Sequence, residues 1–395
     1  MKHHRLAQLA LLMGCALPVL LLLIVPFRGQ RDVSIRENRS LSRFPAFSLS
    51  SFAAGDYQKA LESALGDQYP WGEEIKGAVL DAQNAASRLE GEALTALFPG
   101  AGQAYAEITP GYCHFAGDAH RIVEKPWDLS DETGLRSTAA LFNAAENMKK
   151  FVYFIRNSRT QDFTRPDAEN AAAFDAVRSA YRAEGYACFS AGDYEEYCRL
   201  FYQTDHHWNK DGADRGYREI LRLLGVEEEP APIEKDWTFD VVFNGSYARQ
   251  TKVLCADEKF SAYSYPAAKM KVTLSGKKGQ YGHQALYEKN RFPTDELRNH
   301  YAYYYGGDYG EILIDSGRKT GRSLLLIADS YSNPLNLLLA RHFDRTCVID
   351  LRYYEQDMGK PFDVNSCAAE YQLDTLLMLG DAALFFGAQG EGAER

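Results

Sequence analysis

Short apolar runs alternate with amphipathic segments from residue 139 onward, with one interruption. The runs have the length and composition of buried strands, at residues 151–155, 186–189, 323–328, 346–351 and 375–379. Helical patterns accompany them at residues 141–150, 166–184, 193–201, 209–225, 334–343 and 364–371. Such alternation of strand and helix is typical of a parallel sheet. The pattern therefore predicts an α/β fold in which helices flank a parallel sheet.

Residues 226 to about 310 interrupt this alternation. An acidic, proline-containing linker at residues 227–232 precedes aromatic and Lys-rich pieces that Gly and Pro separate. We interpret this part as an inserted, irregular and β-rich region. Residues 92–130 lack clear periodicity, which predicts short strands and loops, and residues 55–91 show a helical pattern.

The N-terminus carries an uncharged apolar run over residues 6–27. At about 1.5 Å rise per residue this run can cross the apolar core of a bilayer, and Lys2 and Arg5 before it favour a cytoplasmic N-terminus. We therefore predict a single-pass anchor over residues 1–28, with the C-terminal domain outside the cytoplasm in the cell membrane. A cleaved signal peptide is the alternative, and residues 12–15 also look like a lipoprotein processing site.

The remaining domain organisation follows from composition. Residues 29–50 are charged and Ser-rich, as expected of a stalk or strap, and residues 51–395 would form the α/β domain with its insertion at about 226–310. A content of 46% hydrophobic residues is ample for a buried core. The net charge of −10 argues against a general nucleic-acid binder, because phosphate neutralisation needs clustered Lys and Arg.

Six cysteines follow the apolar run, an even number that permits disulfides in an oxidising compartment. Cys188 and Cys198 are the closest pair in sequence. We favour buried thiols, because a core of this size does not need covalent cross-links.

Candidate chemistry lies in two distant segments. Residues 204–208 carry one carboxylate and two imidazoles, and Ser330 follows an apolar strand and precedes a helix. Ligands of open α/β sheets bind beyond the carboxyl ends of the strands, and a serine becomes a nucleophile when a carboxylate-held histidine takes its proton. In an extended segment Asp205 and His207 point the same way, which favours His207 as the base; in a tight turn His206 becomes a candidate.

The motif Asp205-His206-His207-Trp208 resembles the signature of the DHHW protein family, which is related to the SGNH-hydrolase-like alginate O-acetyltransferases of the AlgX and AlgJ type. The resemblance extends to residues 329–332, which form a second specific block, and to less specific segments at residues 37–39, 245–249, 305–308 and 350–354. The resemblance implies an SGNH-like α/β domain and a triad of Ser330, His207 and Asp205. It further implies a serine esterase or O-acetyltransferase that modifies a cell-envelope glycan, beside a multipass membrane acyltransferase.

Two positions depart from the family pattern. Ala328 stands where relatives commonly have Gly before Asp-Ser, and Gly72 stands where they often have Arg. Neither departure touches the three triad residues, although the methyl group of Ala328 adds bulk to the turn before the nucleophile.

Several secondary roles remain open. The oxyanion donors would be the Ser330 N–H and a second group from Asn244, Gly245, Gly306 or Gly307. Trp208 is expected to pack and fix its loop, and Asp329 is a further candidate residue of the site. A metal held by Asp205, His206 and His207, completed by His283 or His300, is the rival interpretation. Adjacent histidines rarely reach one ion together, so we predict no metal and no cofactor.

A non-catalytic alternative also remains. In that case the protein would bind glycans or assist an acyltransferase, with the Tyr-rich residues 301–305 stacking against sugars.

Overall fold

The computed structural model describes residues 30–31, 33–34, 39–69, 78–79, 82, 104–254, 257–279, 281 and 292–387. The predicted anchor over residues 1–28 lies outside these residues. No helix in the described ranges is long and apolar enough to span a bilayer. The chain divides into two compact units, residues 1–93 with the last two residues and residues 94–393. The predicted start of the α/β domain, residue 51, falls within the first of these units.

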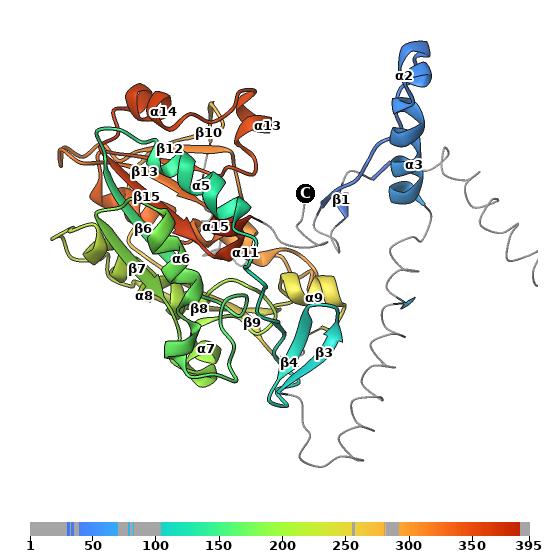
Figure 1. Cartoon of the computed structure of the whole chain (residues 1–395), viewed down its shortest axis with the longest axis horizontal. Helices are drawn as coiled ribbons and strands as arrows, with labels where there is room; N and C mark the ends of the chain where they lie inside the picture. Colours follow the sequence, from blue (N-terminus) through green and yellow to red (C-terminus); the bar gives the residue numbers. More distant parts are fainter. Residues whose placement is uncertain are drawn as a thin grey trace, which may run out of the picture. The chain divides into compact units, whose positions relative to one another are not determined.

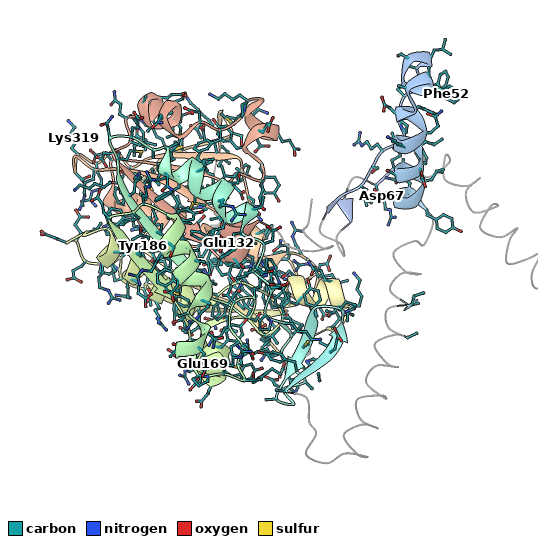
Figure 2. All side chains as sticks on the ribbon, in the orientation of Figure 1. Phe52, Asp67, Glu132, Glu169, Tyr186 and Lys319 are labelled. Carbon is teal, nitrogen blue, oxygen red and sulfur yellow. The ribbon has the colours of Figure 1, made fainter. Side chains whose placement is uncertain are left out.

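The described part of the smaller unit pairs a short hairpin with two helices. Strands β1 (Val33–Ser34) and β2 (Arg39–Ser40) are antiparallel, and α2 (Leu49–Ala54) leads through Gly55 into α3 (Asp56–Gln68). Gly55 has a φ of 83°, which lets the chain turn between the helices. Phe52 projects from α2 and is half exposed (Figure 2). The predicted helical pattern is thus confirmed over α3.

An eight-stranded sheet forms the centre of the larger unit, in the order β11-β10-β12-β14-β13-β15-β6-β7 (Figure 1). Five neighbouring strands are parallel: β14 (Arg345–Ile349), β13 (Ser323–Ala328), β15 (Thr375–Gly380), β6 (Lys149–Ile155) and β7 (Gly185–Phe189). Three antiparallel strands extend one edge: β12 (Glu311–Asp315), β10 (Lys271–Leu274) and β11 (Lys277–Lys278). The predicted α/β fold and its five strands are confirmed.

Both faces of the sheet are buried by helices. Along β13, Leu324 and Leu326 face one core cluster, whereas Leu325 and Ile327 face the other. The first cluster lies under α7 (Tyr194–Leu200), α8 (Lys210–Leu223) and α12 (Asn336–Leu339), which the short helix η4 (Ala340–His342) extends. The second lies under α5 (Thr133–Asn143), α6 (Ala172–Ala180), α13 (Tyr354–Met358), α14 (Val364–Tyr371) and α15 (Ala382–Phe386). Burial on both faces explains why the strands read as unbroken apolar runs.

Two predicted helices have different bounds. The expected helix over residues 141–150 ends at Asn143, and residues from Lys149 onward pair with β15 instead. Asn147 adopts a left-handed conformation in the turn between them, with a φ of 56°. The expected helix over residues 166–184 splits into η2 (Asp167–Asn170) and α6, which ends at Ala180. Strand pairing overrides local propensity at the first of these sites.

The predicted insertion supplies both separate and integrated elements. Strands β8 (Lys235–Val242) and β9 (Lys259–Ser264) form a sheet of their own, while β10 and β11 join the main sheet. Helices α9 (Ser246–Thr251) and α11 (His300–Tyr305) belong to the same stretch. The short strands expected in residues 92–130 are present as β3 (Tyr105–Thr109), β4 (Tyr112–Phe115) and β5 (Val123–Glu124).

The described cysteines have free thiols. Cys113, Cys347 and Cys367 are buried, as predicted, whereas Cys188 and Cys198 are half-buried. Cys347 on β14 and Cys367 on α14 are both buried, and their sulfur atoms lie 3.9 Å apart. Burial raises the pKa of Cys347 well above its usual value. Cys255 lies outside the described residues.

Candidate active site

The carboxyl ends of three neighbouring parallel strands lie side by side, and a polar residue follows each of these strands. Asp329 follows β13, Asp381 follows β15, and Asn157 lies just beyond β6. From these strand ends the chain continues to opposite sides of the sheet, from β6 to β7 on one side and from β13 to β14 on the other. Ligands of open α/β sheets bind at such a switch point. Ser330, next to Asp329, therefore lies where the sequence pattern places a reactive group.

Ser330 opens a single helical turn, η3 (Ser330–Ser332). The Asp329 carboxylate fixes this turn, because its Oδ1 accepts a hydrogen bond of 3.0 Å from the Tyr331 N–H. The Ser330 N–H has no hydrogen-bond partner within the described part of the chain. Strand β13 is buried throughout its length, so the position of the serine is set by the sheet itself.

The segment with the two histidines is a tight loop rather than an extended strand. Phe201 and Trp208 face each other in an antiparallel bridge, and the Tyr202 N–H donates to the His207 carbonyl at 3.2 Å. At the turn, Asp205 Oδ1 accepts the His207 N–H at 3.0 Å. The loop therefore folds back on itself and holds its acid and its second imidazole on one side.

Trp208 fixes the base of this loop. Its side chain is fully buried, and its ring meets Phe189 edge-on with centroids 5.3 Å apart. A Cβ atom at Gly216 of α8 would lie 2.6 Å from Trp208 Cζ3, so this glycine makes room for the indole. The contacts of Trp208 are those of a packing residue, as expected.

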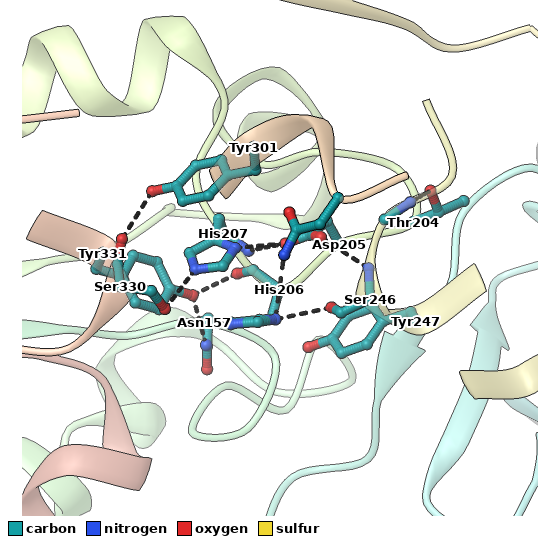
Figure 3. A network of polar contacts seen from close by, with 12 residues as sticks. Asn157, Thr204, Asp205, His206, His207, Ser246, Tyr247, Tyr301, Ser330 and Tyr331 are labelled. Atoms are coloured by element: carbon teal, nitrogen blue, oxygen red, sulfur yellow. Dashed lines mark hydrogen bonds and ion pairs between the residues drawn. The ribbon is translucent and has the colours of Figure 1, made fainter. Parts of the chain in front are cut away.

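Ser330, His207 and Asp205 lie in one hydrogen-bonded line (Figure 3). The distance from His207 Nε2 to Ser330 Oγ is 2.7 Å, and that from His207 Nδ1 to Asp205 Oδ1 is 2.6 Å. The other carboxylate oxygen of Asp205 accepts the Ser246 N–H at 2.7 Å. A carboxylate that orients an imidazole, which in turn contacts a serine hydroxyl, has the geometry that activates a nucleophile.

The electrostatic environment keeps Asp205 charged and His206 neutral. Burial alone would raise the pKa of Asp205, but the adjacent His207 and His206 and the charge of Arg249 together lower it below its usual range. Burial and the neighbouring His207 lower the pKa of His206 well below its usual value. The site therefore combines the ionised carboxylate of Asp205 with the uncharged imidazole of His206.

Gly245 lies against the acid. A Cβ atom at this position would be 2.3 Å from the Asp205 Cβ and 2.5 Å from the Thr204 carbonyl oxygen. Its N–H donates to Thr204 Oγ1 at 3.0 Å. The neighbouring Asn244 is fully buried and donates from its side chain to the Glu296 carbonyl. These residues shape the pocket of Asp205, and the Gly245 N–H considered as an oxyanion donor already has a partner.

Gly306 and Gly307 end helix α11. Both have positive φ, 115° and 73°, and the Gly306 N–H donates to the Ala302 carbonyl at 2.9 Å. The Gly306 N–H considered as an oxyanion donor is thus engaged in the helix cap. The helix that these glycines terminate carries a residue that does reach the site.

That residue is Tyr301, which sequence reasoning missed as a site residue. Its ring is stacked on His207, with centroids 3.9 Å apart and an interplanar angle of 13°. Its hydroxyl donates to the Ser330 carbonyl at 3.0 Å. Tyr301, Tyr304 and Tyr305 are all buried, which corrects the idea that this stretch offers a surface for stacking sugars.

Comparison with solved structures identifies proteins of similar fold. No family model and no curated protein matches the chain. A solved DHHW family protein from Eubacterium siraeum superimposes with a TM-score of 0.53 at 17% identity, covering 72% of this chain and 95% of that one. The chain has the fold of that DHHW protein. The resemblance predicted from the motif is confirmed at the level of the fold.

Two further solved structures are similar. PatB1 from Bacillus cereus, described with a sulfonyl adduct, has a TM-score of 0.51 at 18% identity, covering 70% of this chain and 95% of its own. The O-acetyltransferase domain of AlgJ from Pseudomonas putida matches at 11% identity over 67% of this chain and 83% of its own. Its TM-score of 0.32 is too low to indicate a shared fold.

A polar network adjoins Asp329 and Tyr331, the two neighbours of Ser330 in sequence. Asp381 Oδ2 accepts from Asn157 Nδ2 at 2.7 Å and from Arg159 at 2.8 Å, and Arg159 also pairs with Glu124. The Asn157 amide donates to the Tyr331 hydroxyl at 2.8 Å. Sequence reasoning missed these residues too. Asn157 and Asp381 could have been suspected, since each lies just beyond a predicted strand end.

Asp329 lies close to this network and differs from Asp205 in its ionisation. Burial and the charge of Asp381 raise the pKa of Asp329 to about 8. Near neutral pH the carboxyl group of Asp329, which precedes Ser330, is therefore largely protonated.

Three of the residues considered as metal ligands lie close together. Asp205, His206 and His207 can bring one ligand atom each to within 4.8 Å of one another. However, His207 uses both ring nitrogens on Asp205 and Ser330. His300 is buried and its Nε2 contacts the Pro293 carbonyl, while His283 lies outside the described residues. The contacts describe a hydrogen-bonded network rather than an open coordination shell.

Proposed function

We propose that this protein is a membrane-anchored, extracytoplasmic serine esterase or O-acetyltransferase that acts on a cell-envelope glycan. The observation that carries the proposal is the 2.7 Å contact between His207 Nε2 and Ser330 Oγ, with Asp205 on the opposite ring nitrogen. The three side chains come from a hairpin loop and a strand end that are 123 residues apart in sequence. Such convergence on one hydrogen-bonded line is the arrangement that nucleophilic catalysis by serine requires.

In the first half-reaction, Ser330 Oγ attacks the acetyl carbonyl carbon while His207 Nε2 takes the hydroxyl proton. The tetrahedral intermediate then expels the alcohol, which receives that proton from His207, and leaves acetyl-Ser330. In the second half-reaction, a hydroxyl group gives its proton to His207 and attacks the acetyl carbon. The bond to Ser330 Oγ breaks, and the serine regains its proton.

Asp205 and Ser330 support these steps electrostatically. The ionised Asp205 holds the Nδ1 proton of His207 and stabilises the imidazolium that forms in each half-reaction. The Ser330 N–H, which has no partner within the described residues, is the first donor to the developing oxyanion.

The choice of acetyl transfer on a glycan is supported by the sequence resemblance. The DHHW motif is related to alginate O-acetyltransferases, and the fold is shared with PatB1, whose structure is described with a sulfonyl adduct. Sulfonyl groups react with activated nucleophiles, which is the role assigned here to Ser330. The apolar N-terminal run supports anchoring in the membrane. The multipass acyltransferase that would supply the acetyl group is part of the proposal because the family resemblance implies it.

The test compares acetyl ester cleavage by the whole protein and by Ser330→Ala, with p-nitrophenyl acetate as substrate. We expect release of p-nitrophenol to fall by at least about a hundredfold in the variant. Ser332→Ala is the matched control, since it removes a buried hydroxyl from the same turn without touching His207. Equal release by the parent and by Ser330→Ala would overturn the proposal. Adding an acetylated or a free oligosaccharide then separates hydrolysis from transfer.

A further inference from the structure

His206 is the residue of the loop that the mechanism above leaves without a role. Its side chain is 20% exposed, compared with 8% for His207 and 2% for Asp205. The two imidazoles lie alongside each other, with centroids 3.8 Å apart and an interplanar angle of 35°. His206 is therefore the imidazole that a molecule entering the site can reach.

Two hydrogen bonds hold His206, one on its ring and one on its backbone carbonyl. Its Nδ1 contacts Ser246 Oγ at 2.8 Å, and its carbonyl oxygen accepts a hydrogen bond from the hydroxyl of Tyr331, the residue that follows the nucleophile. In Figure 3 the ring runs along that of His207, with its other nitrogen on the side of Ser330 and away from Ser246. This nitrogen, Nε2, has no hydrogen-bond partner in the part of the chain that the structure describes.

The neighbours of His206 decide which nitrogen carries the proton. Nδ1 lies 3.6 Å from Asp205 Oδ1 as well as 2.8 Å from Ser246 Oγ. A proton on Nδ1 faces two oxygens, one of them anionic, whereas a lone pair there would be repelled by the carboxylate. The proton therefore lies on Nδ1, and Nε2 carries a lone pair. Because burial keeps the ring neutral, Nε2 remains an acceptor.

We infer that His206 Nε2 binds a second O–H group of the molecule that removes the acetyl group from Ser330. The inference rests on the proposed function. The attacking hydroxyl gives its proton to His207, so it cannot also donate that proton to His206. Water has a second O–H to donate, and a sugar offers the hydroxyl on its neighbouring carbon. His206 thus selects an acceptor that carries two O–H groups close together, such as a vicinal diol.

The contact fits the second half-reaction. His207 Nε2 takes the proton of the attacking oxygen, the new C–O bond forms, and the bond to Ser330 Oγ breaks. The second O–H keeps its proton throughout and only hydrogen-bonds to His206. His206 is therefore a binding residue for the acceptor, whereas His207 transfers protons in both halves of the reaction.

The experiment separates the two half-reactions with p-nitrophenyl acetate. The burst of p-nitrophenol reports acetylation of Ser330, and the steady state reports its deacetylation by water, by added ethanol or by added ethane-1,2-diol. His206→Phe keeps a planar ring but removes the acceptor. We expect its burst rate to stay within about threefold of the parent, while deacetylation by water and by the diol falls about three- to tenfold, the effect of one hydrogen bond. The preference for the diol over ethanol should fall to about one.

His206→Gln restores an acceptor oxygen on a flexible chain and should recover part of the diol preference. His120→Phe, which replaces an exposed histidine whose ring pairs with Asp257, is the matched control and should leave both phases unchanged. Equal slowing of burst and deacetylation in His206→Phe would assign a structural role through His207 and overturn the inference. An unchanged diol preference would also overturn it. By contrast, a parent protein with no Ser330-dependent burst would overturn the proposed function itself.

Discussion

The phenol ring of Tyr301 lies parallel to the imidazole of His207, with centroids 3.9 Å apart, and its hydroxyl donates to the carbonyl of Ser330. One buried side chain thus contacts both partners of the proposed proton transfer. Tyr301 comes from α11, within the stretch that interrupts the α/β pattern. The insertion therefore contributes a side chain that contacts both His207 and Ser330.

Replacing Tyr301 separates its two contacts. Tyr301→Phe keeps the stacked ring and removes one hydrogen bond, so we expect kcat/KM for an acetyl ester to fall about three- to tenfold. Tyr301→Leu also removes the aromatic contact and should cost about another tenfold. Tyr304→Phe, in the same helix, contacts neither partner and is the control. Parent-like activity in both Tyr301 variants would contradict a positioning role for this side chain.

Gly245 offers a steric test of the acid. A methyl group there would lie 2.3 Å from the Asp205 Cβ, closer than real contacts allow, so Gly245→Ala must displace the carboxylate or the Thr204 backbone. We expect esterase activity to fall by about two orders of magnitude. Gly66→Ala, where a methyl group meets no atom within 4 Å, should be active. If Gly245→Ala retained parent activity with normal folding by circular dichroism, the tight packing around Asp205 would be unnecessary for function.

Much of this arrangement follows from sequence, because burial on both faces leaves a strong apolar pattern. Strand β13 is bounded by the predicted residues, and the motif identifies Asp205 and His207 before any fold is known. The extended segment that favoured His207 over His206 is wrong, since the loop is a tight turn. His207 nevertheless reaches Ser330, because the Asp205 carboxylate binds both its N–H and its ring.

The remaining site residues could not be predicted because their roles depend on tertiary contacts. Tyr301 is one of several tyrosines in a row, and only the packing of α11 determines which of them stacks on the imidazole. Asp381 and Arg159 are 222 residues apart, and no local pattern indicates their pairing. Strand β12 was not predicted, because it directly follows the irregular stretch and pairs antiparallel with β10 and β14 rather than continuing the parallel pattern.

The charge of Asp205 leads to a further prediction. Asp205→Asn keeps the size of the side chain but lets its amide donate to His207 Nδ1, which moves the ring proton to Nε2 opposite Ser330. The serine then has no base, so kcat should fall by about three to four orders of magnitude, the loss expected when the acid of a Ser-His-Asp triad is replaced by an amide. The measurement is the steady-state rate with p-nitrophenyl acetate. A loss of less than about tenfold would mean that Asp205 does not set the tautomer of His207.

The raised pKa of Asp329 predicts how the stability of the fold depends on pH. Its pKa in the folded protein is raised to about 8 by burial and by the charge of Asp381, whereas an aspartate in an unfolded chain titrates near pH 3.9. Between these values the folded state keeps a proton that the unfolded state has released. The contribution of Asp329 to the free energy of unfolding therefore falls as pH rises from about 4 to about 8.

Asp329→Asn imitates the protonated carboxyl group and keeps an oxygen for the Tyr331 N–H. Melting temperatures of the parent and the variant, measured at about pH 5 and about pH 8.5, should reveal the difference. We expect the parent to lose a few °C more than the variant on going to the higher pH. Asp175→Asn, which neutralises an exposed carboxylate on α6, should change with pH as the parent does. Identical pH dependence in the parent and Asp329→Asn would show that Asp329 is already ionised in the folded protein at low pH.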